Sequence, residues 1–143
     1  MFNNQLKDIF ANHTRLTATW EEIKVLLAEA RASRTASVCL PAVYVARAHQ
    51  TFGADVPIGT VAGFPLGYDG TETKVTAARC AIADGASEVD AVVNLTDVKN
   101  GDFAKVTAEI AALKEAVGDH ILKVIVETCC LTEEEKIALC RCV

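Results

Sequence analysis

Three reactive side chains interrupt otherwise apolar stretches of the sequence: Asp90 in VDAVVNL, Lys123 in HILKVIVET and Cys39 in SVCL. An ionised group buried among valines costs several kcal/mol unless it is paired or hydrogen-bonded. A carboxylate and an amine can exchange protons with a substrate, and an amine or a thiolate can attack one as a nucleophile. The three residues therefore indicate a site for such chemistry, provided that the fold brings them together.

Side chains alternate between the two faces of a β-strand. In each stretch one face is apolar, and the other holds the reactive residue with its neighbours on that face: Val92 and Asn94 for Asp90, Ile125 and Glu127 for Lys123, and Ser37 for Cys39. We expect the apolar faces to pack under helices and the mixed faces to converge in a barrel lumen. Buried strand faces of mixed polarity favour a catalytic site. The alternative is a structural ion pair between Asp90 and Lys123.

The elements that position these residues follow from two periodicities. Segment 19–32 has the apolar spacing of an amphipathic helix, with Thr19 and Glu22 in capping-box spacing. A last helix is expected at 131–143, with Thr132 as its N-cap and Glu135 in the capping-box position. The other expected helices are 44–53, 71–85 and 102–118, and the expected strands are 37–40, 56–65, 89–95 and 120–128.

Strand and helix alternate four times with short connections, and almost every strand is largely apolar on both faces. This pattern is typical of parallel βαβ units, so the predicted fold class is α/β. The glycine-rich fingerprints of nucleotide-binding open sheets are missing, which favours a (β/α) TIM-barrel type. With one more strand near 12–16, the chain supplies about five of the eight strands of a closed barrel. We expect residues 1–143 to form a single domain, an incomplete barrel that oligomerisation would complete.

Composition and charge exclude several classes of function. The formal net charge is −5 without a basic stripe, and the three histidines do not cluster, which argues against a nucleic-acid partner. No window approaches the roughly 18 apolar residues of a membrane span, and no export signal is recognisable, so we expect a cytoplasmic protein. The six cysteines are then expected to be reduced thiols. The spacing of Cys129, Cys130, Cys140 and Cys142 lacks the C-x-x-C knuckles of zinc sites, so no metal is expected.

Five stretches, taken together, resemble one enzyme family: SVCLPAVYV, TVAGFPLG, TETKVTAARCAIADGASEVDAVVNL, DVKNGDF and LKVIVETCCLTEEEK. They are similar to the N-terminal and middle parts of deoxyribose-phosphate aldolase, from about Asn12 to the end of the chain. The resemblance implies a (β/α)8 barrel and a class I aldolase without a metal or other cofactor. Such an enzyme reversibly cleaves 2-deoxy-D-ribose 5-phosphate, through a lysine Schiff base, to D-glyceraldehyde 3-phosphate and acetaldehyde in deoxyribonucleoside catabolism.

The resemblance also assigns roles to single residues. Asp90, in the motif G-A-x-E-V-D, matches the catalytic aspartate that relays protons around the Schiff base. Cys39 and Lys123 match a cysteine and a lysine of the substrate pocket, neither of which is the Schiff-base nucleophile. Asn12 and Thr14 lie where the family often has D-H-T, so an amide replaces one carboxylate of the site region. Residues 38–42 read VCLPA, where the family often has V-C-V-N-P.

The Schiff-base lysine of the family lies in a later strand, K-T-S-T-G, which has no counterpart among these 143 residues. Two functional hypotheses therefore stay open. In the first, the chain belongs to an aldolase that acts on a small phosphorylated sugar. In the second, it is a catalytically inactive half-barrel that serves as an oligomerising scaffold. For either, we expect a homo-oligomer, most simply a two-fold dimer in which each copy covers the other's open sheet or exchanges its terminal helix.

Overall fold

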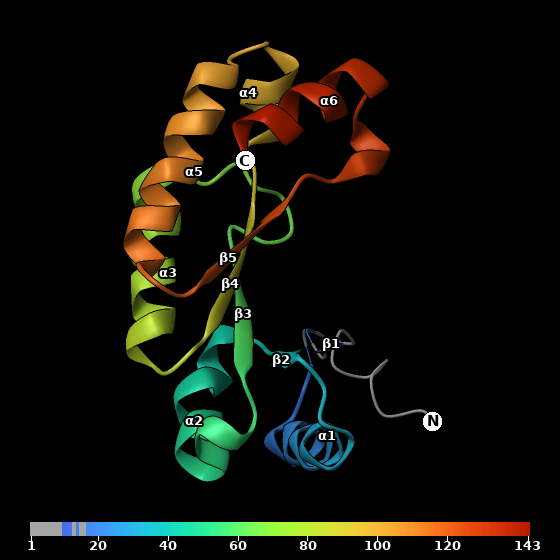
Figure 1. The fold of residues 1–143 in the computed structure, drawn as a ribbon, viewed down its shortest axis with the longest axis vertical. Coiled ribbons are helices and arrows are strands. Elements are labelled where there is room, and N and C mark those ends of the chain that lie inside the picture. The colour runs from blue at the N-terminus through green and yellow to red at the C-terminus, as the bar shows by residue number, and fades with distance from the viewer. Residues whose placement is uncertain (1–9, 13, 15–16) are drawn as a thin grey trace.

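The sheet consists of five parallel strands in the order β1-β2-β3-β4-β5 (Figure 1). The computed structural model describes residues 10–12, 14 and 17–143. The strands are β1 (Phe10–Asn12), β2 (Ser37–Cys39), β3 (Ile58–Ala62), β4 (Glu88–Val92) and β5 (Ile121–Ile125). Neighbours in space are neighbours in sequence, so the α/β prediction is confirmed. Of the first strand, expected near 12–16, only Asn12 lies in β1, and residues 13, 15 and 16 fall outside the described part.

Helical segments connect each strand to the next, and a further helix follows β5. The α-helices are α1 (Trp20–Ser33), α2 (Val45–Phe52), α3 (Thr71–Ala83), α4 (Leu95–Lys99), α5 (Phe103–Val117) and α6 (Glu133–Cys142). Three short 3-10 turns are η2 (Ala42–Tyr44), η3 (Gly53–Asp55) and η4 (Thr128–Cys130). Every helix expected from the sequence is present. Helix α4 was not expected, because its five residues are too few to show a helical period.

Both predicted capping boxes are formed. The Thr19 hydroxyl accepts a 3.4 Å hydrogen bond from the backbone N–H of Glu22, and the Glu22 carboxylate accepts one of 2.8 Å from the N–H of Thr19. At the start of α6, Thr132 and Glu135 make the same two bonds at 3.2 and 2.8 Å. These bonds satisfy N–H groups that a helix start would otherwise leave unpaired, which fixes where α1 and α6 begin.

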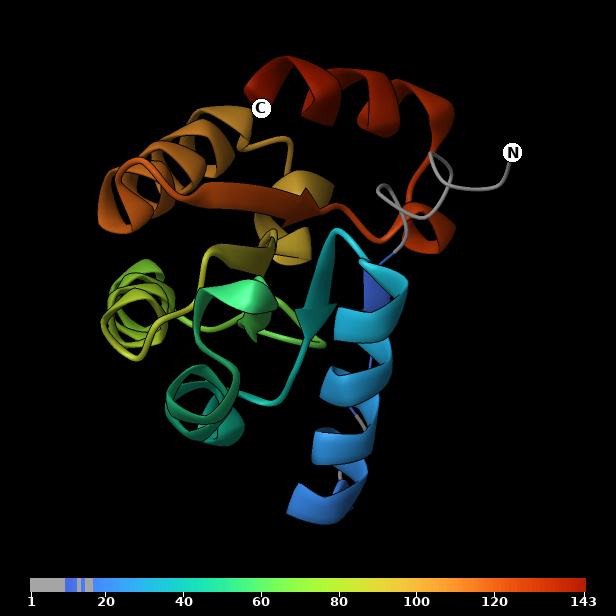
Figure 2. The same cartoon turned by 60° about the horizontal axis from the view of Figure 1, so that its bottom comes forward.

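The helices cover one face of the sheet and build its core. Figures 1 and 2 show α2, α3 and α5 side by side along this face. The larger core cluster joins α1, α2, α3 and α5 to Leu40, which follows β2, and to the strand residues Val38, Ile58, Ala62, Val89 and Ala91. A second cluster, which contains Val98, Ile110, Leu131 and Leu139, packs α4 and α6 against α5. The apolar strand faces thus lie under helices, as the alternation predicted.

A buried ion pair joins two neighbouring helices, α3 and α5. Lys74 of α3 is fully buried, and its Nζ lies 2.8 Å from Oε1 of Glu109 on α5. The same ammonium group donates a 2.8 Å hydrogen bond to the carbonyl oxygen of Val92 at the end of β4. The Thr71 hydroxyl donates to the other oxygen of Glu109 at 3.1 Å. Every polar group of the pair therefore has a partner, as burial of charge requires.

The orientation of β3 differs from the expectation. For the strand expected at 56–65, the prediction from the sequence is that Thr60, Ala62 and Phe64 face the lumen, but Ala62 belongs to the core under the helices. Thr60 is buried and donates a 2.8 Å hydrogen bond to the carbonyl oxygen of Leu40. By alternation, Gly59 and Val61 face the lumen instead. Both faces of this strand are apolar enough that composition does not reveal its orientation.

Among the described residues, no helix has the length and the apolar character that crossing a bilayer would require.

Candidate active site

The mixed faces of β2, β4 and β5 meet on the inner side of the sheet. Asp90 of β4 lies directly beside Lys123 of β5 in the strand register. Cys39 of β2 is level with Gly59 of β3, which is level with Glu88 of β4. Because paired residues of neighbouring strands point to the same side, Cys39, Glu88, Asp90 and Lys123 share one face. The predicted convergence of Cys39, Asp90 and Lys123 is therefore what the register produces.

Two carboxylates flank the lysine. Nζ of Lys123 lies 2.9 Å from Oε2 of Glu88 and 3.0 Å from Oδ1 of Asp90. Oδ1 of Asp90 is buried, and its contact with Lys123 combines hydrogen bonding and charge, both of which raise the pKa of Lys123. The predicted Asp90–Lys123 pair is present, but Lys123 is shared with a second acid.

Glu88 is the deeper of the two acids. Its side chain is 7% exposed, against 19% for Asp90 and 35% for Lys123. Oε2 of Glu88 also accepts a 2.8 Å hydrogen bond from the Ser37 hydroxyl, so this carboxylate is held from two sides. A charge this deep is stable only when it is paired in such a way.

Lys123 remains protonated in this setting. Partial burial disfavours the ammonium group and lowers its pKa, but the contacts with Glu88 and Asp90 outweigh burial, so the net pKa of Lys123 is raised. A lysine that forms a Schiff base must instead have its pKa depressed toward neutrality. Lys123 is thus suited to act as a fixed positive charge and not as a nucleophile.

Cys39 is a buried thiol beside the same charges. Burial is the main cause that raises the pKa of Cys39 to about 11. The negative charge of Asp90 also raises this pKa, the positive charge of Lys123 lowers it, and the negative charge of Glu88 raises it slightly. At neutral pH the side chain is therefore almost entirely the neutral thiol. Because the thiolate is the nucleophilic form, Cys39 has little reactivity of its own here.

Sequence reasoning missed Glu88 and the role of Ser37. The signal was present, because Glu88 stands two residues before Asp90 and must share its face if the strand begins at Glu88. The expected strand began one residue later, at Val89, which left Glu88 outside the alternation. Ser37 was placed on the correct face with Cys39, but nothing in the sequence indicated that Glu88 is its partner.

The two remaining predicted pocket residues are less closely defined. Asn12 is level with Cys39 in the register of β1 and β2, and its side chain is outside the described part. Thr14 lines a hollow of about 360 Å³ together with Tyr44, Val61 and Phe64. Val61 is level with Asp90 in the register, so this hollow adjoins the cluster of Glu88, Asp90 and Lys123.

Asn94 has a structural role and does not join the cluster. It was expected on the lumen face with Asp90, but β4 ends at Val92 and Asn94 is the N-cap of α4. Its Oδ1 accepts a 3.0 Å hydrogen bond from the N–H of Thr96, and its Nδ2 donates one of 3.0 Å to Asp97. Val92, which was expected on the same face as Asp90, is 1% exposed. The turn at Gly67 lies close against Val92 and Val93 and covers this end of the strand.

No group of three or more histidine, cysteine or acidic side chains within residues 10–12, 14 and 17–143 is arranged to hold a metal ion. The six cysteines are free thiols. Sγ of Cys129 lies 3.9 Å from that of Cys130 and donates a 3.0 Å hydrogen bond to Glu127, at the turn that follows β5.

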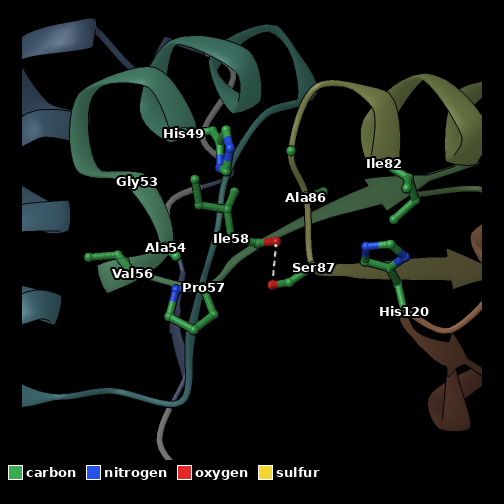
Figure 3. Close-up of a pocket in the computed structure, with 11 residues that line it drawn as sticks. His49, Gly53, Ala54, Val56, Pro57, Ile58, Ile82, Ala86, Ser87 and His120 are labelled. Atoms are coloured by element: carbon green, nitrogen blue, oxygen red, sulfur yellow. Dashed lines mark hydrogen bonds between the residues drawn. The ribbon is translucent and has the colours of Figure 1, made fainter.

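A second hollow, of about 300 Å³, lies at the opposite end of the strands (Figure 3). It is lined by His49, Ser87 and His120 among others, and the Ser87 hydroxyl donates a 3.2 Å hydrogen bond to the carbonyl oxygen of Ile58. Ser87 and His120 directly precede β4 and β5, and Pro57 and Ile58 at the start of β3 also line the hollow, while His49 belongs to α2. Active sites of α/β barrels lie at the carboxyl ends of the strands, so this hollow is separate from the candidate site.

Comparison with known proteins gives a consistent result. The family model described as DeoC/LacD family aldolase matches residues 4–138. A deoxyribose-phosphate aldolase of Clostridium botulinum is 55% identical over 134 residues, which cover 92% of this chain and 61% of the relative. One of Streptococcus agalactiae is 54% identical over 140 residues, which cover 95% of this chain and 63% of the relative. The chain thus spans about three fifths of the length of these relatives.

Solved structures agree with this result. A proposed deoxyribose-phosphate aldolase from Coccidioides immitis superposes with a TM-score of 0.91 at 39% identity, over 95% of this chain and 55% of that one. A tetrameric deoxyribose phosphate aldolase from Aeropyrum pernix gives a TM-score of 0.85 at 23% identity, over 98% of this chain and 59% of that one, and supports the fold alone. The five βα steps therefore correspond to part of a TIM barrel, so the predicted incomplete (β/α) barrel is confirmed.

Proposed function

This chain belongs to the DeoC/LacD family of aldolases, and we propose that it is the N-terminal and middle part of a deoxyribose-phosphate aldolase. In this proposal residues 1–143 form one unit that acts in the reversible cleavage of 2-deoxy-D-ribose 5-phosphate to D-glyceraldehyde 3-phosphate and acetaldehyde. The observation that carries the proposal is the ion pair of Asp90 and Lys123, which lie on neighbouring strands of this chain's sheet.

Asp90 is the proposed catalytic residue. Cleavage of the bond between C2 and C3 requires a base that removes the proton of the C3 hydroxyl, and an acid that later protonates C2. A carboxylate positioned beside a fixed ammonium group can take and return such a proton. Asp90 is more exposed than Glu88 and lies nearer the carboxyl end of β4, where a substrate of an α/β barrel binds.

The nucleophile in this proposal is a lysine other than Lys123. The raised pKa of Lys123 keeps its amine protonated, and a protonated amine cannot attack a carbonyl carbon. The resemblance to the family assigns the Schiff base to a lysine of a later strand. Lys123, Cys39, Thr14 and Asn12 then line the pocket, where Lys123 holds a positive charge beside the reacting carbons.

The phosphate group of the substrate must be bound away from this cluster. Glu88 and Asp90 together carry one more negative charge than Lys123 neutralises, and like charges repel a phosphate. This charge pattern supports a pocket in which the cluster faces the aldehyde end of the sugar.

The second candidate function is an inactive, oligomerising half-barrel. Its support is the outer strand β5 of the described sheet, whose Ile121 is 52% exposed. An unpaired strand edge with apolar side chains is a template for association.

A chimera tests the first function against the second. Residues 1–143 are joined to the segment that follows the matched region in the Clostridium botulinum aldolase, and acetaldehyde release from 2-deoxy-D-ribose 5-phosphate is measured. We expect turnover that falls by at least about 100-fold in Asp90→Asn, the usual effect of losing an acid–base group. Asp119→Asn, which changes an exposed aspartate before β5, is the matched control. A folded chimera that is inactive, or equally active with Asp90→Asn, would contradict the proposal.

A further inference from the structure

We propose that Glu88 is the positioning residue that fixes the ammonium group of Lys123, and that this leaves Asp90 as the carboxylate free to exchange protons. The assignment to Asp90 rests on the proposed aldolase function. The assignment to Glu88 rests only on the geometry of the described residues and can be tested without turnover.

The first support is the reach of Glu88 across the sheet. From β4 its carboxylate extends over β3 to Ser37 on β2, where Oε2 accepts the 2.8 Å hydrogen bond of the hydroxyl. The same oxygen lies 2.9 Å from Nζ of Lys123 on β5. One carboxylate oxygen therefore connects side chains from three strands, β2, β4 and β5.

The second support is the small residue over which Glu88 reaches. Gly59 of β3 lies between Glu88 and Ser37 on the lumen face, level with Glu88 in the register. A Cβ atom built at Gly59 would lie 3.6 Å from both Cβ and Oε2 of Glu88. A longer side chain at this position would occupy the space of the carboxylate. The absence of a side chain at Gly59 thus lets Glu88 lie over β3.

The third support is the difference in exposure between the two acids. The Glu88 side chain is 7% exposed and the Asp90 side chain is 19% exposed, although both contact Lys123 at nearly the same distance. Water screens the charge of the deeper carboxylate less, and Ser37 holds that carboxylate in place, so Glu88 is the acid with the fixed position beside the ammonium group. Asp90 keeps more access to solvent and to a bound substrate.

The position along β4 gives the two acids different tasks. Glu88 is the first residue of the strand and Asp90 the third, so Asp90 is one pleat nearer the carboxyl end at which substrates of α/β barrels bind. If Asp90 alone held Lys123, each proton that Asp90 accepted would remove the countercharge of the lysine. With Glu88 fixed below, Lys123 keeps a countercharge in either protonation state of Asp90.

The pKa of Lys123 provides the test. Among the described residues, the titratable side chains that act on Lys123 include Cys39 on β2 and Glu88 and Asp90 on β4. The 143-residue chain is labelled with ¹³C-lysine and titrated by NMR. The Lys123 resonance is identified as the one that is missing from the spectrum of Lys123→Arg. We expect Glu88→Gln, which keeps the shape and removes the charge, to lower the pKa of Lys123 by about one unit or more. Asp90→Asn should lower it by less.

Glu88→Asp covers the case in which Glu88→Gln does not fold. This variant keeps the charge and withdraws the carboxylate by one methylene, so the pKa of Lys123 should fall by an intermediate amount. An unchanged pKa in whichever Glu88 variant folds would overturn the proposal, and so would a larger fall in Asp90→Asn than in Glu88→Gln. These results do not depend on aldolase turnover, so a failure here is distinct from a failure of the chimera assay.

Discussion

Ser37 and Glu88, which are 51 residues apart in the chain, share a 2.8 Å hydrogen bond across β3. The bond places a fixed negative charge under Lys123, and it forms over the backbone of Gly59. The cluster of Glu88, Asp90 and Lys123 therefore lies on the inner face of the sheet. Substitutions on this face of the sheet should therefore alter the cluster by degrees.

Gly59→Ala and Gly59→Val should differ sharply in stability. A Cβ atom at Gly59 makes ordinary van der Waals contact with Glu88 at 3.6 Å, so alanine fits. The additional methyl groups of valine would compete with the carboxylate for space, and overpacking of this kind costs about 1–3 kcal/mol. Urea unfolding of both variants measures the difference, and equal free energies of unfolding would show that Glu88 does not need the space over Gly59.

Asp90→Asn should leave the fold intact. Glu88 still neutralises Lys123 in this variant, and the contact that is lost is partly exposed to solvent. We expect the free energy of unfolding to fall by no more than about 1 kcal/mol, as for other partly exposed ion pairs. Circular dichroism with urea unfolding checks this, with Asp119→Asn as the control. Loss of cooperative unfolding would make Asp90 a structural residue and weaken its catalytic assignment.

Alkylation of Cys39 should be slow at neutral pH and accelerate as the pH rises. Its pKa of about 11 means that the thiolate fraction increases about tenfold per pH unit below that value. Because the charge of Asp90 raises this pKa, Asp90→Asn should lower it and speed the reaction at a given pH. Mass spectrometry of iodoacetamide-treated chain, with exposed Cys80 as the internal control, follows the site. Rapid modification of Cys39 in the folded chain at neutral pH would contradict this assignment.

The 143-residue chain should form a homo-oligomer, most simply a two-fold dimer. In the described sheet β1 and β5 are the outer strands, and Ile121 of β5 is 52% exposed. Helix α6 is anchored within its own chain by buried Leu139 and by the 2.7 Å ion pair of Lys99 with Glu135, which favours coverage of the open sheet over helix exchange.

Size-exclusion chromatography with light scattering measures this association. Ile121→Lys should weaken it, while Val25→Lys, at an exposed position on α1, should not. A well-folded monomer at micromolar concentration would refute the expectation.

Much of the fold and the centre of the site could be predicted from local patterns. Period-two alternation placed Asp90 and Lys123 on one face, and the strand register makes them neighbours. Capping residues such as Thr19 and Thr132 marked helix starts, because they act on backbone groups only three residues away. Each of these signals lies within a few residues of the structure that it predicts.

The parts that could not be predicted depend on distant partners. Nothing near Lys74 indicates that Glu109, 35 residues later, would pair with it in the core. The orientation of Thr60 depends on the carbonyl group of Leu40, directly after β2, since the apolar residues of β3 fit either face. Glu88 was missed because the expected strand began one residue too late, and its pairing could not be predicted because its partners Ser37 and Lys123 come from two other strands.

The role of Lys123 as a fixed charge, with the Schiff base formed elsewhere, is tested most directly by borohydride trapping. The 143-residue chain and the chimera are each reduced in the presence of acetaldehyde and analysed by peptide mass spectrometry. For the chain alone we expect no turnover near that of the intact family and no stoichiometric adduct. For the chimera we expect one adduct, on a lysine of the joined segment. A stoichiometric adduct on Lys123 in either protein would contradict this and make Lys123 the nucleophile.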